Sequence, residues 1–595
     1  MVSISGYQIT EQLYNGSRTL VYRAIREADQ KPVVIKLLKN SHPDFNELLQ
    51  FRNQYTIGKN LNYSGIIQTY SLENYQNGYA LVMEDMQGVL LSEYMVGENI
   101  TSLQDILSIA IQITDILHNL HQNRVIHKDI KPANILINPE TKEIKLIDFS
   151  ISSLLPKETQ EIKNPNVLEG TLAYLSPEQT GRMNRGVDFR ADFYALGVTL
   201  FELLTGELPF KSDDAVELVH CHIAKTPPSI NQAQSSSFVD INKSEANSFV
   251  DINKPHPNPL LVKERGQENY PVISNIVMKL MAKNAEDRYQ SALGLKHDLE
   301  KCLYQLKETG EIEDFEIALL DICDRFIIPE RLYGREREVE QLLATFGRVS
   351  NGNRELMLVA GFSGIGKTAV INEVHKPIVK QRGYFIKGKF DQFNRNIPLD
   401  AFVQAFRSLI GQLLGESDAQ LSSWKNKVLQ ALGDNAQVII DVIPELEQIT
   451  SKQPSVPELS GTAAQNRFNL LFQKFIQVFT TKEHPLVVFL DDLQWADSAS
   501  LKLMQLLMSE SENGYLLLIG AYRDNEVFPA HPLMLTLEEI AVAEAIVNTI
   551  TLTPLKQESL NQLVADTLNC SGEIAQPLTQ LIYQKTQGNP FFSTQ

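Results

Sequence analysis

Apolar residues in the first part of the chain follow the two-residue period of strands. Residues 8–10 and 19–22 alternate apolar and polar side chains around a turn, whereas 32–37 and 79–83 are more continuously apolar. Side chains on a strand point alternately to its two faces. These segments therefore predict a hairpin followed by buried strands of one small sheet.

A helical period follows. The apolar residues at positions 109, 113, 116, 117 and 120 recur every three or four positions, which predicts a core helix that ends at His121. His118 and His121 lie one turn apart on this helix, as a pair of metal ligands can, but no carboxylate accompanies them. We interpret them as surface or cap residues in preference to metal ligands.

Two fully apolar runs in the second half, residues 356–360 and 486–490, indicate another kind of sheet. Strands with apolar side chains on both faces are typical of parallel sheets covered by helices. An amphipathic helix with Leu342 and Phe346 on its apolar face precedes the first run. The pattern predicts a multidomain protein, α+β first and α/β second, and at ~150 residues per unit the 595 residues suggest about four compact units.

A short repeat interrupts the regular pattern. The heptapeptide S-F-V-D-I-N-K occurs at residues 237–243 and again at 248–254, and the proline-rich stretch 255–259 follows directly. Two copies are too few for a repeat architecture, and the interval exceeds the ~12–15 residues of an ordinary loop. The sequence predicts an inserted, largely disordered excursion over about 232–268, which we interpret as a spacer in preference to a docking site.

Composition narrows the class of protein. A formal net charge of -18 would repel a polyanion, which argues against a nucleic-acid partner. The cysteines, Cys221, Cys302, Cys323 and Cys570, form no C-x-x-C pair, as expected in a reducing cytosol. The chain opens with no signal peptide and contains no run of ~18 apolar residues that could span a bilayer. We expect a cytoplasmic protein with no membrane partner.

The strongest chemical signal combines H-K-D-I-K-P-A-N-I-L at residues 127–136 with K-L-I-D-F-S at 145–150. Phosphoryl transfer to a hydroxyl needs a carboxylate to orient the acceptor, a cation for the γ-phosphate, and oxygen ligands for Mg²⁺. The two segments supply these groups in order, as Asp129, Lys131, Asn134 and Asp148.

This ordered run resembles the protein kinase superfamily, and the lysine that follows the first aspartate resembles its Ser/Thr branch. The resemblance implies that Asp129 orients the acceptor hydroxyl and takes its proton, and that Lys131 contacts the γ-phosphate. It also implies that Asn134 and Asp148 hold Mg²⁺.

The same resemblance implies a bilobal fold over residues 1–302, with an N-lobe at about 1–86 and a C-lobe at about 87–302. Lys36, in the V-V-I-K strand, would contact the α- and β-phosphates of ATP. The other residues implied to bind ATP are Gly16 and Val21 in the glycine loop and Glu84 and Met86 in the interlobe hinge.

Further residues match structural features of the family. Glu178, in S-P-E, should form the salt bridge that anchors the C-lobe with Arg288. Thr171 would bridge to Asp129 and favour Ser/Thr acceptors, and Asp192 opens a D-x-x-x-x-G helix start.

Four departures from the family pattern favour an alternative hypothesis for the activity of this domain. Gly16 is the one glycine kept of the three in the loop, and Gln54 stands where a glutamate pairs with the strand lysine. Lys128 replaces an arginine and Ser150 replaces a glycine. The alternative to an active kinase is therefore a pseudokinase–ATPase signalling scaffold with little phosphotransfer activity.

A second nucleotide signal follows residues 356–360. The segment G-F-S-G-I-G-K-T, between an expected strand and an expected helix, is a P-loop, whose backbone N–H groups cradle phosphates. Its lysine would reach the β- and γ-phosphates and its threonine would bind Mg²⁺. The expected ligands are Gly361, Gly364, Gly366, Lys367 and Thr368.

The apolar run 486–490 leads to a pair of aspartates. Asp491 would hold Mg²⁺ and Asp492 would polarise an attacking water, and Arg523 is either a γ-phosphate sensor or a surface arginine. With Y-G-R-E and G-N-P-F-F, these motifs resemble AAA-like ATPases of the STAND group. The resemblance implies a P-loop domain over 331–595 with a truncated helical region. Before it, the Lys-, Glu- and Gln-rich composition from Cys302 to Glu313 predicts a helical tail and then a linker, at 303–330.

The order of the modules resembles the front part of large cyanobacterial signalling kinases. That resemblance implies an ATP- and Mg²⁺-dependent Ser/Thr kinase acting on protein substrates. The ATPase domain, with probable slow hydrolysis, would act as a regulatory switch. Its expected partners are C-terminal sensor or histidine-kinase modules, or a separate chain that carries them.

Overall fold

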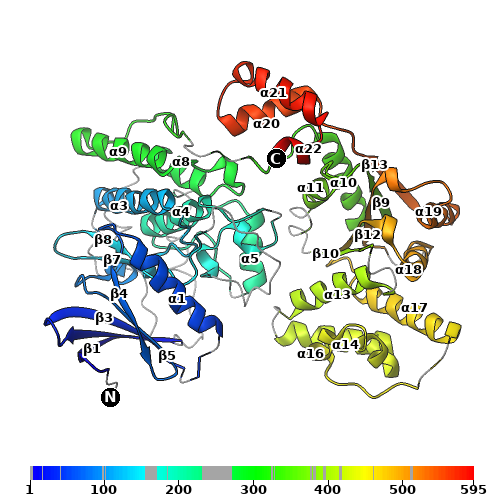
Figure 1. Ribbon diagram of the computed structural model, residues 1–595, viewed down its shortest axis with the longest axis horizontal. Coiled ribbons are helices and arrows are strands. Elements are labelled where there is room, and N and C mark those ends of the chain that lie inside the picture. Colours follow the sequence, from blue (N-terminus) through cyan, green and yellow to red (C-terminus); the bar gives the residue numbers. More distant parts are fainter. Residues whose placement is uncertain are drawn as a thin grey trace, which may run out of the picture.

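The computed structural model contains an antiparallel sheet with its helices, followed by a parallel sheet with its helices (Figure 1). It describes residues 4–595 apart from 17, 41, 44, 97–99, 101, 155–169, 184, 213, 229, 231–270, 323–325, 327, 375–377, 379–382, 393–396, 415–417, 458, 460, 510–513 and 544. The repeat at 237–243 and 248–254 and the expected excursion over about 232–268 lie outside the described residues.

Five antiparallel strands form the first sheet, in the order β1-β2-β3-β5-β4. The period-two pattern sorts their side chains: Ile35 and Leu37 pack into the cluster on one face, while Val34 packs on the other face against Phe51 of α1. Lys36 follows the parity of Val34 and so points toward α1. The elements are β1 (Tyr7–Asn15), β2 (Thr19–Arg26), β3 (Lys31–Leu38), α1 (Phe45–Asn60), β4 (Thr69–Tyr75) and β5 (Gly78–Glu84).

The lobe that follows is mainly helical. The predicted core helix exists as α3, which begins after Ser102 with a reciprocal cap between Ser102 and Asp105 and ends at Gln122. The elements are β6 (Val89–Leu90), α2 (Leu91–Val96), α3 (Leu103–Gln122), β7 (Ile135–Ile137), β8 (Ile144–Leu146), α4 (Arg190–Thr205), α5 (Ala215–Ala224), α8 (Pro271–Leu280) and α9 (Ala292–Thr309).

A buried ion pair ties distant segments of this lobe together. Both guanidinium Nη atoms of Arg288 donate to the carboxylate of Glu178, at 2.6 and 2.8 Å, and Nη1 also donates to the carbonyl of Arg190. The guanidinium is fully buried, so the bidentate geometry and the extra acceptor compensate for its desolvation. The predicted salt bridge is confirmed.

The segment after α9 packs on the same lobe. Helix α9 continues past residue 302, and Ile312 and Phe315 contact the C-lobe core. The carboxylate of Asp321 accepts hydrogen bonds from the backbone N–H groups of Gln290 (2.7 Å) and Ser291 (2.8 Å). Residues 303–321 were expected to belong to a linker. They pack as part of this lobe because α9 presents a further apolar face and backbone donors to them.

The second sheet is parallel throughout, in the order β10-β11-β12-β9-β13. Along β9, Met357 and Val359 pack on one face with α10, and Leu356 and Leu358 pack on the other. Apolar residues at every position are thus used on both faces. The strands are β9 (Arg354–Ala360), β10 (Tyr384–Lys389), β11 (Leu486–Asp491), β12 (Leu516–Tyr522) and β13 (Ile546–Thr551).

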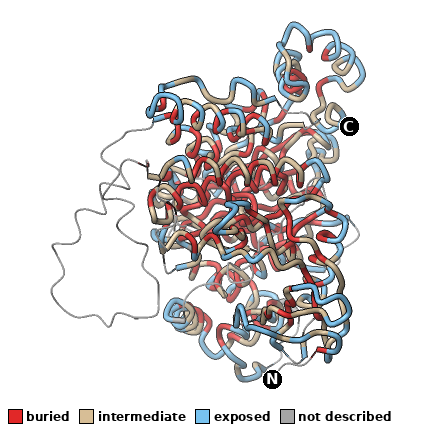
Figure 2. Tube along the Cα trace, turned by 90° about the vertical axis from the view of Figure 1, so that its left-hand side faces the viewer, coloured by how far each residue is buried: buried red, intermediate tan, exposed pale blue. Residues whose placement is uncertain are grey.

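Helices cover both faces of this sheet (Figure 1), and apolar side chains of the two faces are buried against them. In the described chain as a whole, buried residues lie inside the fold and exposed residues lie along its outer edges (Figure 2). The helices are α10 (Glu336–Ser350), α11 (Lys367–Asn372), α13 (Asp400–Leu413), α14 (Asp418–Leu432), α15 (Ala436–Ile440), α16 (Glu447–Thr450), α17 (Gly461–Val478), α18 (Ser498–Ser509), α19 (Pro532–Val542), α20 (Gln557–Leu568), α21 (Gly572–Thr586) and α22 (Pro590–Thr594). Short 3-10 turns, among them η1 (Pro132–Asn134) and η9 (Leu493–Trp495), lie beside the candidate sites.

Candidate functional sites

Lys36 stands at the centre of the first candidate site. Its ammonium donates to Oε1 of Gln54, on α1, at 3.0 Å and lies 3.1 Å from Oδ1 of Asp148. Lys36 and Gln54 are 9% and 3% exposed. The expectation that Gln54 faces Lys36 is confirmed. The lysine therefore meets one carboxylate and one neutral amide, where two carboxylates would give it a second anionic partner.

Asp148 follows β8 with a left-handed backbone, φ 65°. Burial disfavours its charged form, but the charge of Lys36 and hydrogen bonds from Lys36 and Ser150 outweigh that effect and lower its pKa to about 2. Both of these contacts are made by Oδ1, and the side chain is 32% exposed. Asp148 is therefore an anion at neutral pH with Oδ2 outside the lysine contact, which suits a ligand for Mg²⁺.

The catalytic-loop groups converge on Asp129. Its Oδ2 accepts from Nζ of Lys131 (2.6 Å) and from Nδ2 of Asn134 (2.8 Å), and its Oδ1 accepts from the N–H of Thr171 (3.0 Å). Lys131 also donates to Oγ1 of Thr171. Three residues that are separated in sequence thus surround one carboxylate, and the expected contact between Thr171 and Asp129 is confirmed.

Asp192, at the start of α4, holds the backbone of this loop. Its carboxylate accepts from the N–H groups of His127 (3.0 Å) and Lys128 (2.8 Å) and lies 3.0 Å from Nε2 of His121. His121 is 5% exposed, so its interpretation as a surface or cap residue is wrong. The carboxylate that accompanies it comes from a helix seventy-one positions away, which local spacing cannot reveal.

The neighbouring His127 is fully buried, and burial lowers its pKa despite the nearby carboxylates. Its Nδ1 accepts from the N–H of Asp129 at 3.3 Å, and its Nε2 lies 3.1 Å from the carbonyl of Ile147. A neutral imidazole with Nε2 protonated satisfies both contacts. His127 therefore links the loop of Asp129 to the strand that leads to Asp148.

Asn53 is a residue that the sequence did not single out. Its Nδ2, on α1, lies within hydrogen-bond distance of the carbonyls of Phe149 (3.3 Å), Ser150 (3.1 Å) and Ser152 (2.8 Å). Helix α1 therefore makes two contacts with the site. Asn53 contacts the loop that follows Asp148, and Gln54 contacts Lys36. The only sequence signal is that the two are adjacent, because the partners are backbone atoms and leave no mark on residue type.

Val21, Glu84 and Met86 were expected to bind ATP, and the structure gives each of them a contact within the protein. Val21 on β2 pairs directly with Lys36 on β3. In the hinge, the side chain of Glu84 binds Nζ of Lys145 at 2.6 Å, and the carbonyl of Met86 accepts from Nδ2 of Asn138 at 3.3 Å. Glu84 is thus anchored to the strand that precedes Asp148.

Lys39 contacts the glycine loop through two hydrogen bonds. Nζ of Lys39 donates to Oδ1 of Asn15 (2.9 Å) and to the carbonyl of Gly16 (3.0 Å). A Cβ at Gly16 would lie 2.4 Å from the ring of Tyr14, an exposed side chain that would have to move to make room for it.

The second candidate site is the turn between β9 and α11. Gly361, Gly364 and Gly366 have φ values of 150°, 74° and 97°, which side chains other than glycine rarely adopt. Nζ of Lys367 donates to the carbonyls of Gly361 (2.7 Å) and Phe362 (3.0 Å). The lysine lies across its own loop, and burial lowers its pKa.

The partner carboxylates lie at the end of β11. Oγ1 of Thr368 donates to Oδ2 of Asp491 at 3.3 Å, so the two expected Mg²⁺ ligands are adjacent. Burial and then the neighbouring charge of Asp492 raise the pKa of Asp491. A divalent cation beside Asp491 would offset both effects.

Asp492 lies in a separate network. It has a left-handed φ of 55° and is 5% exposed, and its carboxylate accepts from Nε2 of Gln494 (2.9 Å). Lys389 and Arg523 approach the same carboxylate at 3.3 and 3.5 Å. The guanidinium of Arg523 also lies 4.9 Å from the ring centre of Trp495. Three donors therefore surround the group that was expected to polarise water.

Two further segments reach the P-loop. Nη2 of Arg335 donates to the carbonyls of Thr553 (2.6 Å) and Ile365 (3.3 Å). Nδ2 of Asn589 donates to the carbonyl of Ser363 at 3.1 Å. The motifs Y-G-R-E and G-N-P-F-F marked these regions, but only the fold shows that both motifs contact the phosphate-binding turn.

Comparisons with known proteins agree with these two sites. Residues 7–299 match the protein kinase domain and residues 331–519 match the AAA ATPase domain. Hybrid signal transduction histidine kinase G of Dictyostelium discoideum is 32% identical over 638 residues, which cover 82% of this chain and 17% of that protein. Serine/threonine-protein kinase PrkC of Bacillus subtilis is 32% identical over 50% of the chain, and PknB of Mycobacterium tuberculosis is 28% identical over 49%.

The chain therefore carries a protein kinase domain followed by an AAA-type ATPase domain, both of which use ATP with Mg²⁺. It spans 40% of the length of PrkC and 42% of that of PknB. Among the described residues, no helix is long and apolar enough to cross a membrane. The same residues include no cluster of three or more His, Cys, Asp and Glu side chains suited to a metal ion.

Proposed function

We propose that the first domain transfers the γ-phosphate of ATP to a serine or threonine of a protein, and that the ATPase domain regulates this reaction. The observation that carries the proposal is a pair of contact sets: Lys36 meets Asp148, and Asp129 is surrounded by Lys131, Asn134 and Thr171. Bound Mg–ATP would supply the phosphoryl group that is transferred, and Mg²⁺ would reduce the negative charge on the phosphate oxygens.

The roles of the residues follow from these contacts. Before transfer, the ammonium of Lys131 at 2.6 Å stabilises the anionic carboxylate of Asp129. Asp129 then accepts the proton of the acceptor hydroxyl, whose oxygen would bond to the γ-phosphorus as the bond from that phosphorus to the ADP oxygen breaks. Asn134 commits Nδ2 to Asp129, which leaves its Oδ1 for a cation. Asp148 offers the second oxygen ligand, and Lys36 orients it while contacting the α- and β-phosphates.

A pseudokinase with little transfer activity is the second candidate function. One contact favours it: Lys36 is held by an amide, so only Asp148 supplies a negative charge to position its ammonium. We favour the active enzyme because Lys36, Asp129, Lys131, Asn134 and Asp148 are all present, and a missing metal carboxylate costs more than a weakened supporting contact.

The test is transfer of label from radioactive ATP to protein by the full chain. Asp129→Asn keeps the shape of the side chain and removes the base, so labelling should fall by ~10²–10⁴-fold. A matched control is Asp115→Asn, on α3, whose carboxylate accepts a hydrogen bond from Nζ of Lys296 on α9. Equal labelling by wild type and Asp129→Asn would exclude the transfer mechanism.

For the second domain we propose a nucleotide-dependent switch with slow hydrolysis. The carboxylate of Asp492 is held by Gln494, Lys389 and Arg523, so these contacts must change before it can accept a hydrogen bond from an attacking water. Arg523 would report the γ-phosphate to this network, because it bonds to both Asp492 and Glu526.

Tryptophan fluorescence tests this proposal. The chain has two tryptophans, Trp424 and Trp495, and Trp424→Phe leaves Trp495 beside Arg523 as the reporter. Addition of Mg–ATP should change its emission, and Lys367→Ala should abolish the change. An unchanged nucleotide titration in Lys367→Ala would refute the switch.

We further propose that the substrates are proteins with Ser or Thr acceptors and that sensor or histidine-kinase modules, in the same or another chain, complete the system. The module order of the cyanobacterial signalling kinases motivates this proposal. We also propose a cytoplasmic location, because Cys221, Cys302 and Cys570 are free thiols. The proposed kinase unit extends from the N-terminus through Asp321, and the ATPase unit begins near residue 331.

A further inference from the structure

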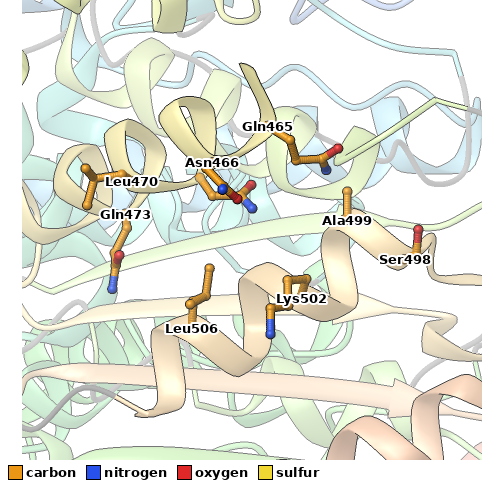
Figure 3. Close-up of a pocket in the computed structure, with 9 residues that line it drawn as sticks. Gln465, Asn466, Leu470, Gln473, Ser498, Ala499, Lys502 and Leu506 are labelled. Carbon is orange, nitrogen blue, oxygen red and sulfur yellow. The ribbon is translucent and has the colours of Figure 1, made fainter. Parts of the chain in front are cut away.

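A groove between α17 and α18, lined by more polar residues than apolar ones, belongs to neither nucleotide site. Its volume is about 370 Å³, and side chains from the two helices point into it (Figure 3). That volume is within the ~300–1,000 Å³ range of ligand pockets. The polar residues that line it are Gln465, Asn466, Asn469, Gln473, Ser498 and Lys502.

Asn469 is the residue that points to a ligand. It is 7% exposed, and its Oδ1 is buried with no hydrogen-bond partner in the protein. Gln473, one turn further along, is 6% exposed. A buried amide oxygen without a partner destabilises a fold, so a donor from outside the chain is the expected complement.

The spacing of the amides identifies the class of ligand. Gln465, Asn469 and Gln473 are four residues apart on α17, which at a ~1.5 Å rise per residue spaces them by ~6 Å along the helix. An extended peptide repeats every two residues, or ~6.6–6.8 Å. Successive side-chain amides can therefore meet successive peptide groups, since each amide offers one acceptor and donor N–H groups.

The other residues that line the groove indicate which side chains and which terminal group the peptide can carry. Lys502 supplies a positive charge. Its Nζ donates a hydrogen bond to Oε1 of Gln505, a neutral amide, at 2.7 Å. The apolar lining is confined to Leu470, Ala499 and Leu506, and the described lining has neither a carboxylate nor an aromatic ring. Small side chains and one acidic group would fit this surface, whereas a base would find no ring to stack on.

We propose that this groove binds an extended peptide segment of about three or four residues through its main chain, with an acidic side chain or carboxyl terminus beside Lys502. Asn469 accepts a main-chain N–H, and Gln465 and Gln473 bind the flanking peptide groups. The ATPase domain would thereby hold a peptide recognition site separate from its nucleotide site.

The test uses the full chain and a pentapeptide labelled with fluorescein at its N-terminus, Ala-Thr-Ala-Thr-Asp, followed by fluorescence polarisation. The control peptide has alternate amide nitrogens methylated, which removes main-chain donors without changing a side chain. Wild type should bind the first peptide saturably and the methylated peptide at least about tenfold more weakly. Equal affinity for both peptides, or no binding at 1 mM, would overturn the proposal.

Three variants sharpen the result. Asn469→Leu should weaken binding at least about tenfold, while Lys474→Gln, an exposed substitution on the same helix outside the groove, should change it less than about twofold. Lys502→Gln should weaken the peptide with Asp but not the same peptide ending in Asn-amide. Unchanged binding by Asn469→Leu refutes the site. Displacement of the peptide by 10 mM free glutamine would instead indicate a small-amide site and also refute it.

Discussion

The two nucleotide sites each contain a buried lysine, and they hold it in different ways. Lys36 is oriented by side chains from other segments, Gln54 at 3.0 Å and Asp148 at 3.1 Å. Lys367 donates to two carbonyls of its own turn, at 2.7 and 3.0 Å. A phosphate must therefore draw Lys367 away from its loop, whereas Lys36 already stands beside the metal carboxylate. The first arrangement suits catalysis, and the second suits a switch that responds to occupancy.

The carboxylates of Asp148 and Asp491, the two candidate Mg²⁺ ligands, differ in the same sense. The pKa of Asp148 is lowered because the charge of Lys36 outweighs burial, whereas the pKa of Asp491 is raised by burial and by Asp492. Asp148 thus has its counter-charge in place before any cation binds. Asp491 gains one only when a cation or nucleotide arrives, so binding should change its surroundings more.

The largest effect should come from removing the carboxylate that Lys36 positions. Asp148→Asn removes the metal charge, and we expect protein labelling from ATP to fall by ~10²–10⁴-fold because charge stabilisation in phosphoryl transfer is lost. Asp491→Asn should abolish the Trp495 response. Because it removes regulation and not the transfer step, it should change labelling of an exogenous peptide by no more than a few-fold. If both variants lost labelling equally, the two sites would not have separate roles.

Asp492→Ala should destabilise the ATPase domain. Removing this carboxylate leaves the buried side-chain amide of Gln494 without its acceptor, and an unpaired buried polar group costs about 1–3 kcal/mol. The midpoint of the tryptophan-monitored urea transition should move to lower denaturant. Asp497→Asn is unsuitable as a control because it caps α18, whereas Asp434→Asn, in an exposed turn, is suitable. A higher midpoint in Asp492→Ala would contradict the network.

Gln54→Glu should have a smaller effect and in the opposite direction. A carboxylate at this position gives Lys36 a second anionic partner, and charge-assisted hydrogen bonds are roughly twice as strong as neutral ones. We expect labelling activity to rise about threefold to tenfold. If Gln54→Glu remained folded but lost activity, the prediction would be wrong, and the glutamine would support catalysis better than a glutamate.

The smallest effect concerns acid stability. The folded pKa of Asp148, about 2, lies below its unfolded value of ~3.9. Its contribution to stability is therefore present above the unfolded value and is lost as the pH falls toward 2. The difference in calorimetric transition temperature between wild type and Asp148→Asn should shrink from pH 5 to pH 3. A difference that grows over this interval would contradict the sign of the shift.

Much of both sites could be predicted, because their chemistry lies in short ordered segments. The residues around Asp129 and the P-loop each occupy one turn next to a strand, so sequence order largely fixes their local geometry. The salt bridge between Glu178 and Arg288 was also predicted, although 110 positions separate the two residues, because both belong to recognisable motifs.

The failures share one physical cause. His121 was misread because its carboxylate partner, Asp192, comes from another helix, and Asn53 was missed because it binds only backbone carbonyls. Residues 303–321 were assigned to a linker because their polar composition does not reveal the backbone donors of Gln290 and Ser291 that hold Asp321. Each contact joins groups that are far apart in sequence.

The sequence by itself determined the two sheets, the two nucleotide-binding turns and the residues that could ligate Mg–ATP, because strand parity, glycine positions and residue type act locally. Only the tertiary structure decided which charges meet. It placed Asp148 against Lys36, surrounded Asp492 with donors, and left Oδ1 of Asn469 without a partner in a groove between two helices. Electrostatic interactions depend on distances in space, and those distances are set by packing between segments that do not adjoin in the chain.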